Sequence, residues 1–310
     1  MPEHFRVEAV ERICHVSRED ITQRFRLECA AFALIHRMSG RIVNESATSH
    51  VYPCTMVSTF RRLFRSASRI LRNQGIGGLL LAVREWLAVR QKYIKLNGCT
   101  FVLRALPNPA VTRALVRREY EEFERRAVRQ YVRPNLPVVE LGGCFGVVAC
   151  ITNRKLDRGT LHVVVEANPR VISFIEKNRS LNRCNFELLN AAIAYGQPTV
   201  TFCPSFDMPS NSLRENHGAD AVTVNTISLG EIVRQRDIDS FTLICDIEGH
   251  EYDLVQNEAD AIQRAEIIIL ETHARMIGDA KNSELLARLE EIGFKEIDEE
   301  ATVVVLQRCV

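Results

Sequence analysis

The pattern of apolar and polar positions separates a mainly helical first part from a regularly alternating second part. After Pro137, short apolar segments rich in Val and Ile alternate with stretches of helical periodicity. The predicted strands are 138–141, 161–165, 186–189, 241–245 and 267–270, and the predicted helices lie near 146–155, 169–182, 228–236, 251–263 and 281–292. This alternation is typical of βαβ units and predicts an α/β fold whose mostly parallel sheet carries helices on both faces.

The last part of the chain departs from the alternation. Residues 295–298 and 302–307 are predicted as two strands, joined by an acidic turn at Glu299 and Glu300. A connection this short joins antiparallel neighbours. We therefore expect an antiparallel hairpin at one edge of the sheet.

The first part of the chain is expected to form two regions beside the sheet domain, which we place at 137–310. Residues 1–55 are predicted to be a helical and dispensable extension, and residues 56–136 a basic cap region. Within the cap, Asn97-Gly98 predicts the turn of a β-hairpin. A single charged helix is predicted from Thr112 to Val132, before two prolines.

Charge follows the same division. Residues 1–136 contain 24 basic and 12 acidic side chains, whereas residues 137–310 contain 16 and 27. Residues 56–95 combine nine basic side chains with one acid at helical spacing. Such helices can contact an anionic membrane surface, cover a substrate pocket, or simply face water. Their aromatic and basic residues do not interleave regularly, so we expect no nucleic-acid partner.

The cysteines and the apolar runs bear on the compartment. The ten cysteines include no C-x-x-C pair, and several lie inside apolar segments, which argues against structural zinc and suits a reducing environment. No apolar run approaches the roughly 20 residues of a membrane span, and the first residues do not resemble a signal peptide. We expect a cytoplasmic protein that can contact a membrane peripherally.

The first predicted strand runs into a glycine-bearing turn. Glu140-Leu-Gly-Gly-Cys-Phe-Gly146 stands between this strand and the next predicted helix. Gly142 and Gly146 let the backbone approach a ligand closely, and the helix N-terminus offers free N–H groups. The spacing differs from the G-x-G-x-x-G of dinucleotide-binding proteins and lacks the lysine of a phosphate-binding loop.

Polar residues end three successive strands and point to one ligand. Glu140 would repel a pyrophosphate but attract a cation such as S-adenosylmethionine, which carries an ammonium and a sulfonium group. Glu166 can accept hydrogen bonds from both ribose hydroxyls, and Asn190-Ala191 can read an adenine edge. Because open α/β sheets bind ligands at the carboxyl ends of their strands, we predict an S-adenosylmethionine site there.

Two further strand ends complete a recognisable set. The fourth is followed by Asp246-Ile-Glu-Gly-His-Glu251, and the fifth ends in Glu271-Thr-His273. Together with the glycine turn, Val165–Pro169 and Asn190–Ile193, these segments resemble the FkbM family of class I methyltransferases over about residues 93–308. The most specific part is the match of residues 246–251 to the family's D-[VI]-E-G-x-E.

The resemblance implies a Rossmann-like, seven-stranded sheet and O-methylation of a hydroxyl on a sugar, lipid or natural product. It also implies that Glu140, Gly142 and Gly146 flank the methionine part of the cofactor. Tyr120-Glu121 is similar to a Tyr-Glu element of the family. Three residues depart from the family pattern, with Glu140 in place of an aspartate, Cys144 in place of an asparagine and Ile244 in place of a lysine, and the first of these changes keeps the charge.

Transfer of a methyl group to a hydroxyl requires a nearby proton acceptor. We predict Asp246 and His273 as the catalytic residues, with Glu248 and His250 as weaker candidates. Asp246, Glu248, Glu271 and His273 could alternatively hold Mg²⁺, but we expect no resident metal.

Two other functions stay open at this point. A nicotinamide or nucleotide-sugar enzyme would share the sheet, and a non-catalytic scaffold would keep the fold without the chemistry. The polar segment 203–221 is expected to form a long loop that covers or selects the substrate.

Overall fold

A computed structural model describes residue 73 and residues 91–103, 106–203 and 221–309. The chain divides into two units after Arg72, and all the described residues belong to the second unit. The predicted extension 1–55, most of the basic segment 56–95 and most of the polar loop 203–221 lie outside the described residues. The predicted boundaries between these regions therefore stay predictions.

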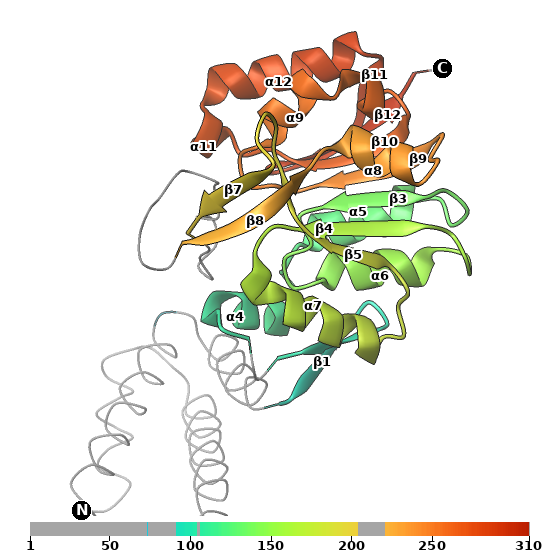
Figure 1. The fold of residues 1–310 in the computed structure, drawn as a ribbon. Coiled ribbons are helices and arrows are strands. Elements are labelled where there is room, and N and C mark those ends of the chain that lie inside the picture. The colour runs from blue at the N-terminus through green and yellow to red at the C-terminus, as the bar shows by residue number, and fades with distance from the viewer. Residues whose placement is uncertain (1–72, 74–90, 104–105, 204–220, 310) are drawn as a thin grey trace, which may run out of the picture. The chain divides into compact units, whose positions relative to one another are not determined.

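A seven-stranded sheet forms the centre of the described unit, in the order β11-β12-β10-β9-β3-β4-β5 (Figure 1). Its strands are β3 (Val138–Leu141), β4 (His162–Glu166), β5 (Glu187–Asn190), β9 (Phe241–Cys245), β10 (Ala265–Glu271), β11 (Phe294–Glu300) and β12 (Val303–Arg308). The five strands from β5 to β10 are parallel, and β12 is antiparallel to both of its neighbours. The predicted Rossmann-like fold class is confirmed, including the antiparallel hairpin at one edge.

The bounds of that hairpin correct one detail of the prediction. Glu299 and Glu300 do not form the turn, because they continue β11 and pair with Val304 and Val303. The turn lies at Ala301-Thr302, where Ala301 has a φ of 57°. Strand pairing with the apolar β12 thus extends β11 through acidic positions that the sequence pattern assigns to a turn.

Helices cover both faces of the sheet, as the alternation predicts. Alternate strand residues such as Val139 and Leu141 point to one face, and Val138 and Val164 point to the other. The helices are α4 (Pro109–Arg117), α5 (Glu122–Tyr131), α6 (Val147–Lys155), α7 (Pro169–Leu181), α8 (Leu229–Gln235), α9 (Glu251–Asn257), α10 (Ala259–Ile262), α11 (Ala274–Ile277) and α12 (Asp279–Glu291). Helices α4 to α7 pack on the Val138 face, and α8, α9, α10 and α12 on the Val139 face.

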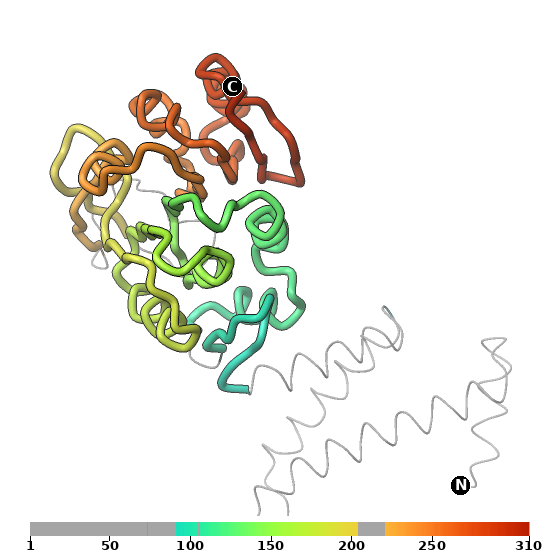
Figure 2. The backbone as a smooth tube through the Cα atoms, turned by 90° about the vertical axis from the view of Figure 1, so that its right-hand side faces the viewer, coloured from blue at the N-terminus to red at the C-terminus, as the bar shows by residue number. Residues whose placement is uncertain are grey.

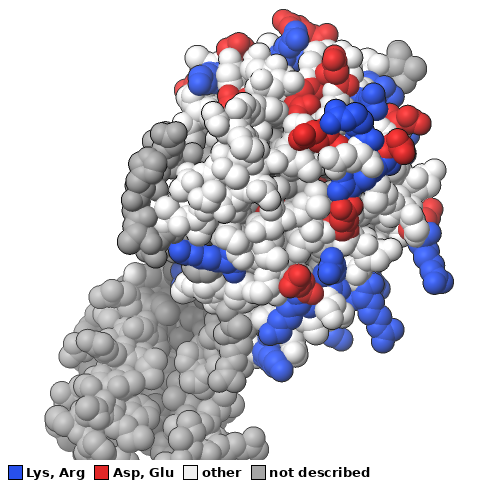
Figure 3. Space-filling model, in the orientation of Figure 1, with Lys and Arg blue, Asp and Glu red and all other residues white. Residues whose placement is uncertain are grey.

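A second, three-stranded sheet is absent from the sequence prediction. It consists of β6 (Ala192–Ile193), β8 (Val222–Ile227) and β7 (Thr199–Phe202), with β8 in the middle. A single residue, Ala191, separates β6 from β5, so the sequence pattern does not show where one strand ends and the next begins. Neither β7 nor β8 contains a charged residue, and the face over them in Figure 3 is mostly free of charge.

The helix predicted from Thr112 to Val132 is wrong, because the chain forms two helices here. The residues between α4 and α5 include Arg118 and Glu121, whose φ angles of 69° and 46° interrupt the helical path. The buried Arg125 stabilises this break. Its Nε donates to the Tyr120 carbonyl and its Nη2 to the Arg118 carbonyl, both at 2.7 Å.

The predicted hairpin turning at Asn97-Gly98 is present as β1 (Tyr93–Leu96) and β2 (Cys99–Val102). It lies beside α7, at the opposite end of the unit from β11 and β12 (Figures 1 and 2). Two asparagines of α7 bind its edge. Asn182 accepts from the Thr100 amide at 2.7 Å and donates to the Thr100 carbonyl at 2.8 Å, and Asn178 accepts from the Val102 amide at 2.9 Å.

Within the described residues, no helix is both long enough and apolar enough to cross a membrane. The described cysteines are all free, and Cys99, Cys150 and Cys245 are buried. They pack as small apolar side chains, in line with their positions in apolar segments.

We expect Arg125→Ala to lower the free energy of unfolding by roughly 2–4 kcal/mol, because the buried guanidinium makes charge-assisted hydrogen bonds whose acceptors would lose their partner. The guanidinium also donates to Asn97, so the loss reaches the hairpin turn. Urea denaturation measures this change. The neighbouring Arg126 is the control, since it forms an exposed ion pair with Glu300 at 2.8 Å and Arg126→Ala should cost less than about 1 kcal/mol. Equal losses in the two variants would contradict this role of Arg125.

Candidate active site

The turn between β3 and α6 brings two strand ends into direct backbone contact. Gly142 has a φ of 93°, and a Cβ on this residue would lie 1.7 Å from the Asp246 carbonyl oxygen at the end of β9. Gly146 has a φ of 72° and begins α6. Gly142 therefore lets the turn approach the end of β9, and no other residue fits there without moving β9, whereas the predicted approach of both glycines to a ligand stays a prediction.

Glu166 supports this turn from the neighbouring strand. Its side chain is 7% exposed, its Oε2 accepts from the Cys144 amide at 2.7 Å, and its Oε1 accepts from the Asn168 amide at 2.6 Å. Burial raises the pKa of Glu166 to about 7, against the opposing effect of these backbone hydrogen bonds. A carboxylate oxygen that accepts one hydrogen bond keeps a second lone pair for a ligand.

Asn190 and Ala191 follow β5, next to the end of β4. The Asn190 amide nitrogen donates to the carbonyls of Glu166 and Ala167 at 2.8 and 3.1 Å. Asn190 itself is exposed, whereas Ala191 is buried. The two residues thus lie at the same sheet edge as Glu166, and their contact with an adenine stays a prediction.

Glu140 is placed differently from the other predicted ligand-binding residues. Its carboxylate is 1% exposed, and its Oε2 lies 3.4 Å from Nε2 of His162 on β4. This contact lies on the face of the sheet that α6 covers, because Glu140 shares the side of β3 with Val138. Burial raises the pKa of Glu140, although the His162 contact opposes this effect.

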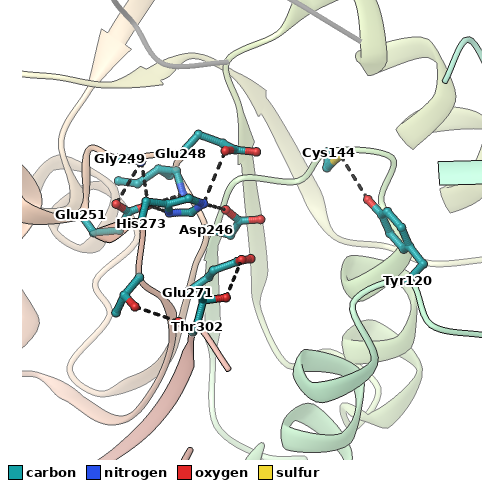
Figure 4. Close-up of polar contacts among 11 residues, drawn as sticks. Tyr120, Cys144, Asp246, Glu248, Gly249, Glu251, Glu271, His273 and Thr302 are labelled. Atoms are coloured by element: carbon teal, nitrogen blue, oxygen red, sulfur yellow. Dashed lines mark hydrogen bonds and ion pairs between the residues drawn. The ribbon is translucent and has the colours of Figure 1, made fainter. Parts of the chain in front are cut away.

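The ends of β9 and β10 gather the predicted catalytic residues around His273 (Figure 4). Nε2 of His273 lies 3.6 Å from Oδ1 of Asp246 and 3.4 Å from Oε2 of Glu248. On the other side of the ring, Nδ1 lies 2.9 Å from Oε1 of Glu251. Asp246 and His273, which the sequence analysis selected independently from two strand ends, are therefore neighbours.

A cavity opens between these strand ends and α5. It is lined by Glu121, Glu124, Glu140, Gly142, Gly143, Val148, Ile244, Cys245, Asp246, Ile269 and Glu271. Among the described residues that line it, five have carboxylate side chains and none is a lysine or arginine. Tyr120 lies near the same turn and donates from its hydroxyl to Cys144 Sγ at 3.2 Å. Of the predicted residues, Glu140, Gly142 and Asp246 line the cavity.

The crowded carboxylates hold protons more tightly than usual. Desolvation raises the pKa of Asp246 well above its ordinary value, and the nearby charges of Glu271 and Glu248 add to this effect. Desolvation likewise raises the pKa of Glu124 to about 7. Each shift reflects chiefly the loss of water around the carboxyl group, with a smaller contribution from neighbouring acidic side chains, so a cationic ligand would favour the ionised forms here.

The site contains the ligand set for the alternative metal function as well. Asp246, Glu271 and His273 offer ligand atoms that all lie within 4.8 Å of one another. Oxygen and imidazole donors at this spacing can hold a divalent cation.

The sequence analysis did not select Glu124 or Glu251 as site residues. Glu124 lies three positions after Glu121, and this spacing brings two side chains to one face of a helix. Glu251 belongs to the matched motif, but nothing in the spacing shows that its side chain turns back toward β10. An acid at the first position of a helix usually favours the helix dipole and is not by itself a signal of function.

We expect the ligand-free protein to become less stable as the pH rises. The folded-state pKa of Glu166 is raised from 4.5 to about 7, so its stabilising contribution is complete below 4.5 and is lost as the pH rises through about 7. The change for this group is on the order of 1–3 kcal/mol. Urea denaturation between pH 5 and 8 measures it, and Glu166→Gln should flatten the profile. Glu176→Gln, on the exposed side of α7, is the control, and a wild-type profile that rises with pH would contradict the assignment.

Comparison with known proteins identifies the family. The profile described as the methyltransferase FkbM domain matches residues 140–296, which is half of the chain. Hexuronic acid methyltransferase AglP from Haloferax volcanii is 23% identical over 159 residues, which cover 48% of this chain and 64% of that protein. The chain thus spans somewhat less than two thirds of the length of this relative.

Solved methyltransferase structures are similar to the described unit. Precorrin-6y C5,15-methyltransferase from Geobacter metallireducens GS-15 is 13% identical, with coverage of 61% of this chain and 86% of that chain and a TM-score of 0.37. TYW2 from M. jannaschii, solved in complex with AdoMet, is 14% identical, with coverage of 70% and 86% and a TM-score of 0.37. On the strength of the family profile, the chain belongs to the FkbM methyltransferase family.

Proposed function

We propose that this protein transfers the methyl group of S-adenosylmethionine to a hydroxyl of a neutral sugar or a similar small acceptor. The observation that carries the proposal is the cavity of five carboxylates beside the glycine turn, at the carboxyl ends of β3, β9 and β10. The methyltransferase family supports S-adenosylmethionine as the cofactor. The positive charge of this ligand would stabilise the ionised form of Asp246, whose pKa is raised first by burial and then by the charges of Glu271 and Glu248.

The cofactor would lie along the strand ends from β9 to β5. Glu166, held beside the turn by backbone N–H groups, would bind the ribose hydroxyls. Asn190 and Ala191 would contact the adenine, and Gly142 and Gly146 would let the methionine part approach the backbone. Glu140 lies on β3 just before the turn and contacts His162. Its charge would attract the cationic cofactor from there.

The cofactor supplies an activated methyl group, and the chain supplies alignment and a proton acceptor. His273 and Asp246 are the proposed proton acceptors, because their side chains contact each other at the carboxyl ends of β9 and β10. The protonated imidazole would be stabilised by the carboxylates beside it, which favours transfer of the hydroxyl proton to Nε2.

The charge of the cavity bears on the acceptor. The relative AglP is named for action on hexuronic acid, which supports a sugar acceptor. An acceptor carboxylate would, however, face the acidic side chains of Glu121, Asp246 and Glu271. Like charges at short range in a desolvated site are unfavourable, so we infer that a neutral hydroxyl is the better substrate.

We expect Glu166→Gln to weaken the binding of S-adenosylhomocysteine at least tenfold. A hydrogen bond to a charged acceptor contributes about 1.5–3 kcal/mol, and each 1.4 kcal/mol is about a factor of ten in affinity. Isothermal titration calorimetry measures the change, with Glu176→Gln as the control. NAD should give no thermal stabilisation. Unchanged affinity for S-adenosylhomocysteine in Glu166→Gln would contradict the proposed ribose contact.

We expect His273→Asn to lower kcat by about 10²- to 10⁴-fold while leaving the Kd of S-adenosylhomocysteine unchanged, because it removes a proton acceptor but keeps a donor toward Glu251. Nearby carboxylates raise the pKa of His273 above 6.5, chiefly through the Glu251 hydrogen bond, against the effect of burial. The wild-type rate should therefore rise with pH through a value above 6.5. Labelled methyl transfer to neutral glycosides and uronic acids measures the rates.

The control for this variant is His250→Asn in the neighbouring loop. Nδ1 of His250 lies 3.7 Å from Oδ2 of Asp253, an exposed side chain of α9. Its rate should stay within a few-fold of the wild type. Dialysis against EDTA should also leave the wild-type rate unchanged. A rate that requires added Mg²⁺ would show His273 to be a metal ligand and would overturn its role as the proton acceptor.

A further inference from the structure

Glu251 is a completely buried carboxylate at the start of α9. Its side chain is 0% exposed, and burial of a carboxylate is costly unless its oxygens are hydrogen-bonded. Oε1 accepts from the Ile247 amide at 3.1 Å, and Oε2 accepts from the Gly249 amide at 3.0 Å. The third partner is the ring of His273, at 2.9 Å from Oε1. The backbone amides hold the carboxylate in place, and the carboxylate holds the ring.

This arrangement determines which nitrogen of His273 carries the proton. An ionised carboxylate only accepts hydrogen bonds, so Nδ1 must be the donor in the contact with Glu251. The neutral imidazole then has its lone pair on Nε2. Nε2 points to Asp246 and Glu248, on the side of the ring opposite to Glu251 (Figure 4).

We infer that Glu251 is the positioning residue of the proposed methyl transfer, because it fixes the Nδ1–H form of His273 and directs the basic Nε2 toward Asp246, which lines the cavity. The inference rests on the proposed function. Glu251 touches neither the acceptor nor the cofactor in this scheme, and it acts only through the histidine. The D-I-E-G-H-E segment therefore contains both Glu251 and the two backbone amides that hold its carboxylate in place.

The acceptor oxygen forms a bond to the methyl carbon while the bond between this carbon and sulfur breaks, and the bonding electron pair stays on sulfur. The hydroxyl proton moves to Nε2 of His273. The resulting imidazolium carries both ring protons, and the charges of Glu251 on α9, Glu248 after β9 and Glu271 on β10 stabilise it, while Asp246 lies 3.6 Å from its Nε2. Release of the Nε2 proton to water restores the neutral ring.

The charge of Glu251 affects the pKa of His273, and the position of its carboxylate affects the tautomer of the ring. Removal of the negative charge destabilises the imidazolium, so the pKa of His273 should fall. Loss of the fixed acceptor at Nδ1 also lets the ring populate the other tautomer, in which Nε2 carries the proton and is no longer basic. Glu251→Gln is therefore expected to shift the acid limb of the rate profile to lower pH and to lower the plateau of kcat at least tenfold.

The direct test is NMR of the full chain with ¹⁵N-labelled histidine, without cofactor or acceptor. The His273 signals are assigned by their absence in His273→Asn. Above its pKa, wild-type His273 should show a protonated Nδ1 and an unprotonated Nε2. The opposite tautomer in the wild-type protein would overturn the inference, whatever the variants do. Glu251→Gln should lower the His273 pKa and mix the tautomers.

The matched control is Glu258→Gln. Glu258 is also a buried glutamate that accepts from a backbone amide, that of Gly230 at 3.1 Å, but it lies at α10, away from His273. This variant should leave the His273 tautomer, the His273 pKa and the pH profile unchanged. Glu251→Asp, which keeps the charge, should preserve a raised His273 pKa. If Glu251→Gln behaves like Glu258→Gln, the inference is wrong.

Different results would contradict the proposed methyl transfer and the positioning role of Glu251. A wild-type ring in the expected tautomer, together with no methyl transfer to any acceptor, would contradict the proposed function and leave the pairing of Glu251 with His273 intact. Methyl transfer that survives in His273→Asn would remove the histidine from the mechanism, and the positioning role of Glu251 would fall with it.

Discussion

The contact between the Gly142 backbone and the Asp246 carbonyl is the constraint on which the site depends. A side chain at position 142 would overlap this carbonyl, so only glycine lets the ends of β3 and β9 approach each other. The Asp246 amide also donates to the Leu141 carbonyl at 2.9 Å. Because the two strand ends are locked together, the turn that supports Glu166 and the loop that supports His273 have a fixed separation.

Acidic side chains are crowded together at the carboxyl ends of the central strands. The rest of the described unit buries apolar side chains on two faces, whereas the cavity brings five carboxylates together. The protein offsets part of this repulsion with backbone N–H groups, as at Glu166 and Glu251, and with the ring of His273. Such local departures from favourable burial are characteristic of functional sites.

The sequence predicted the parts of the structure that depend on local patterns. The alternation along the chain predicted the seven strands of the main sheet, and the residues at their ends suggested Glu166, Asp246 and His273, whose roles stay predictions. The break before Glu122 was missed because it depends on Arg125 reaching carbonyls outside its own helix. The contact of the Glu251 side chain with His273 was missed for a similar reason, since it depends on where the fold places the end of β10. The contact of Glu140 with His162 was not predicted, because it follows from the packing of β4 against β3, and the place of Glu140 beside the cofactor stays a prediction.

The asparagine contacts of α7 have a consequence for the order of assembly. The edge of β2 is completed by Asn182, which is 82 residues further along the chain than its partner Thr100. At roughly 5–20 residues per second of synthesis, the new chain grows for about 4–16 s before that partner exists. During this interval the N-terminal strands have an open edge, which is the kind of surface that recruits other chains. Nascent protein is therefore most vulnerable to mispairing before α7 emerges from the ribosome.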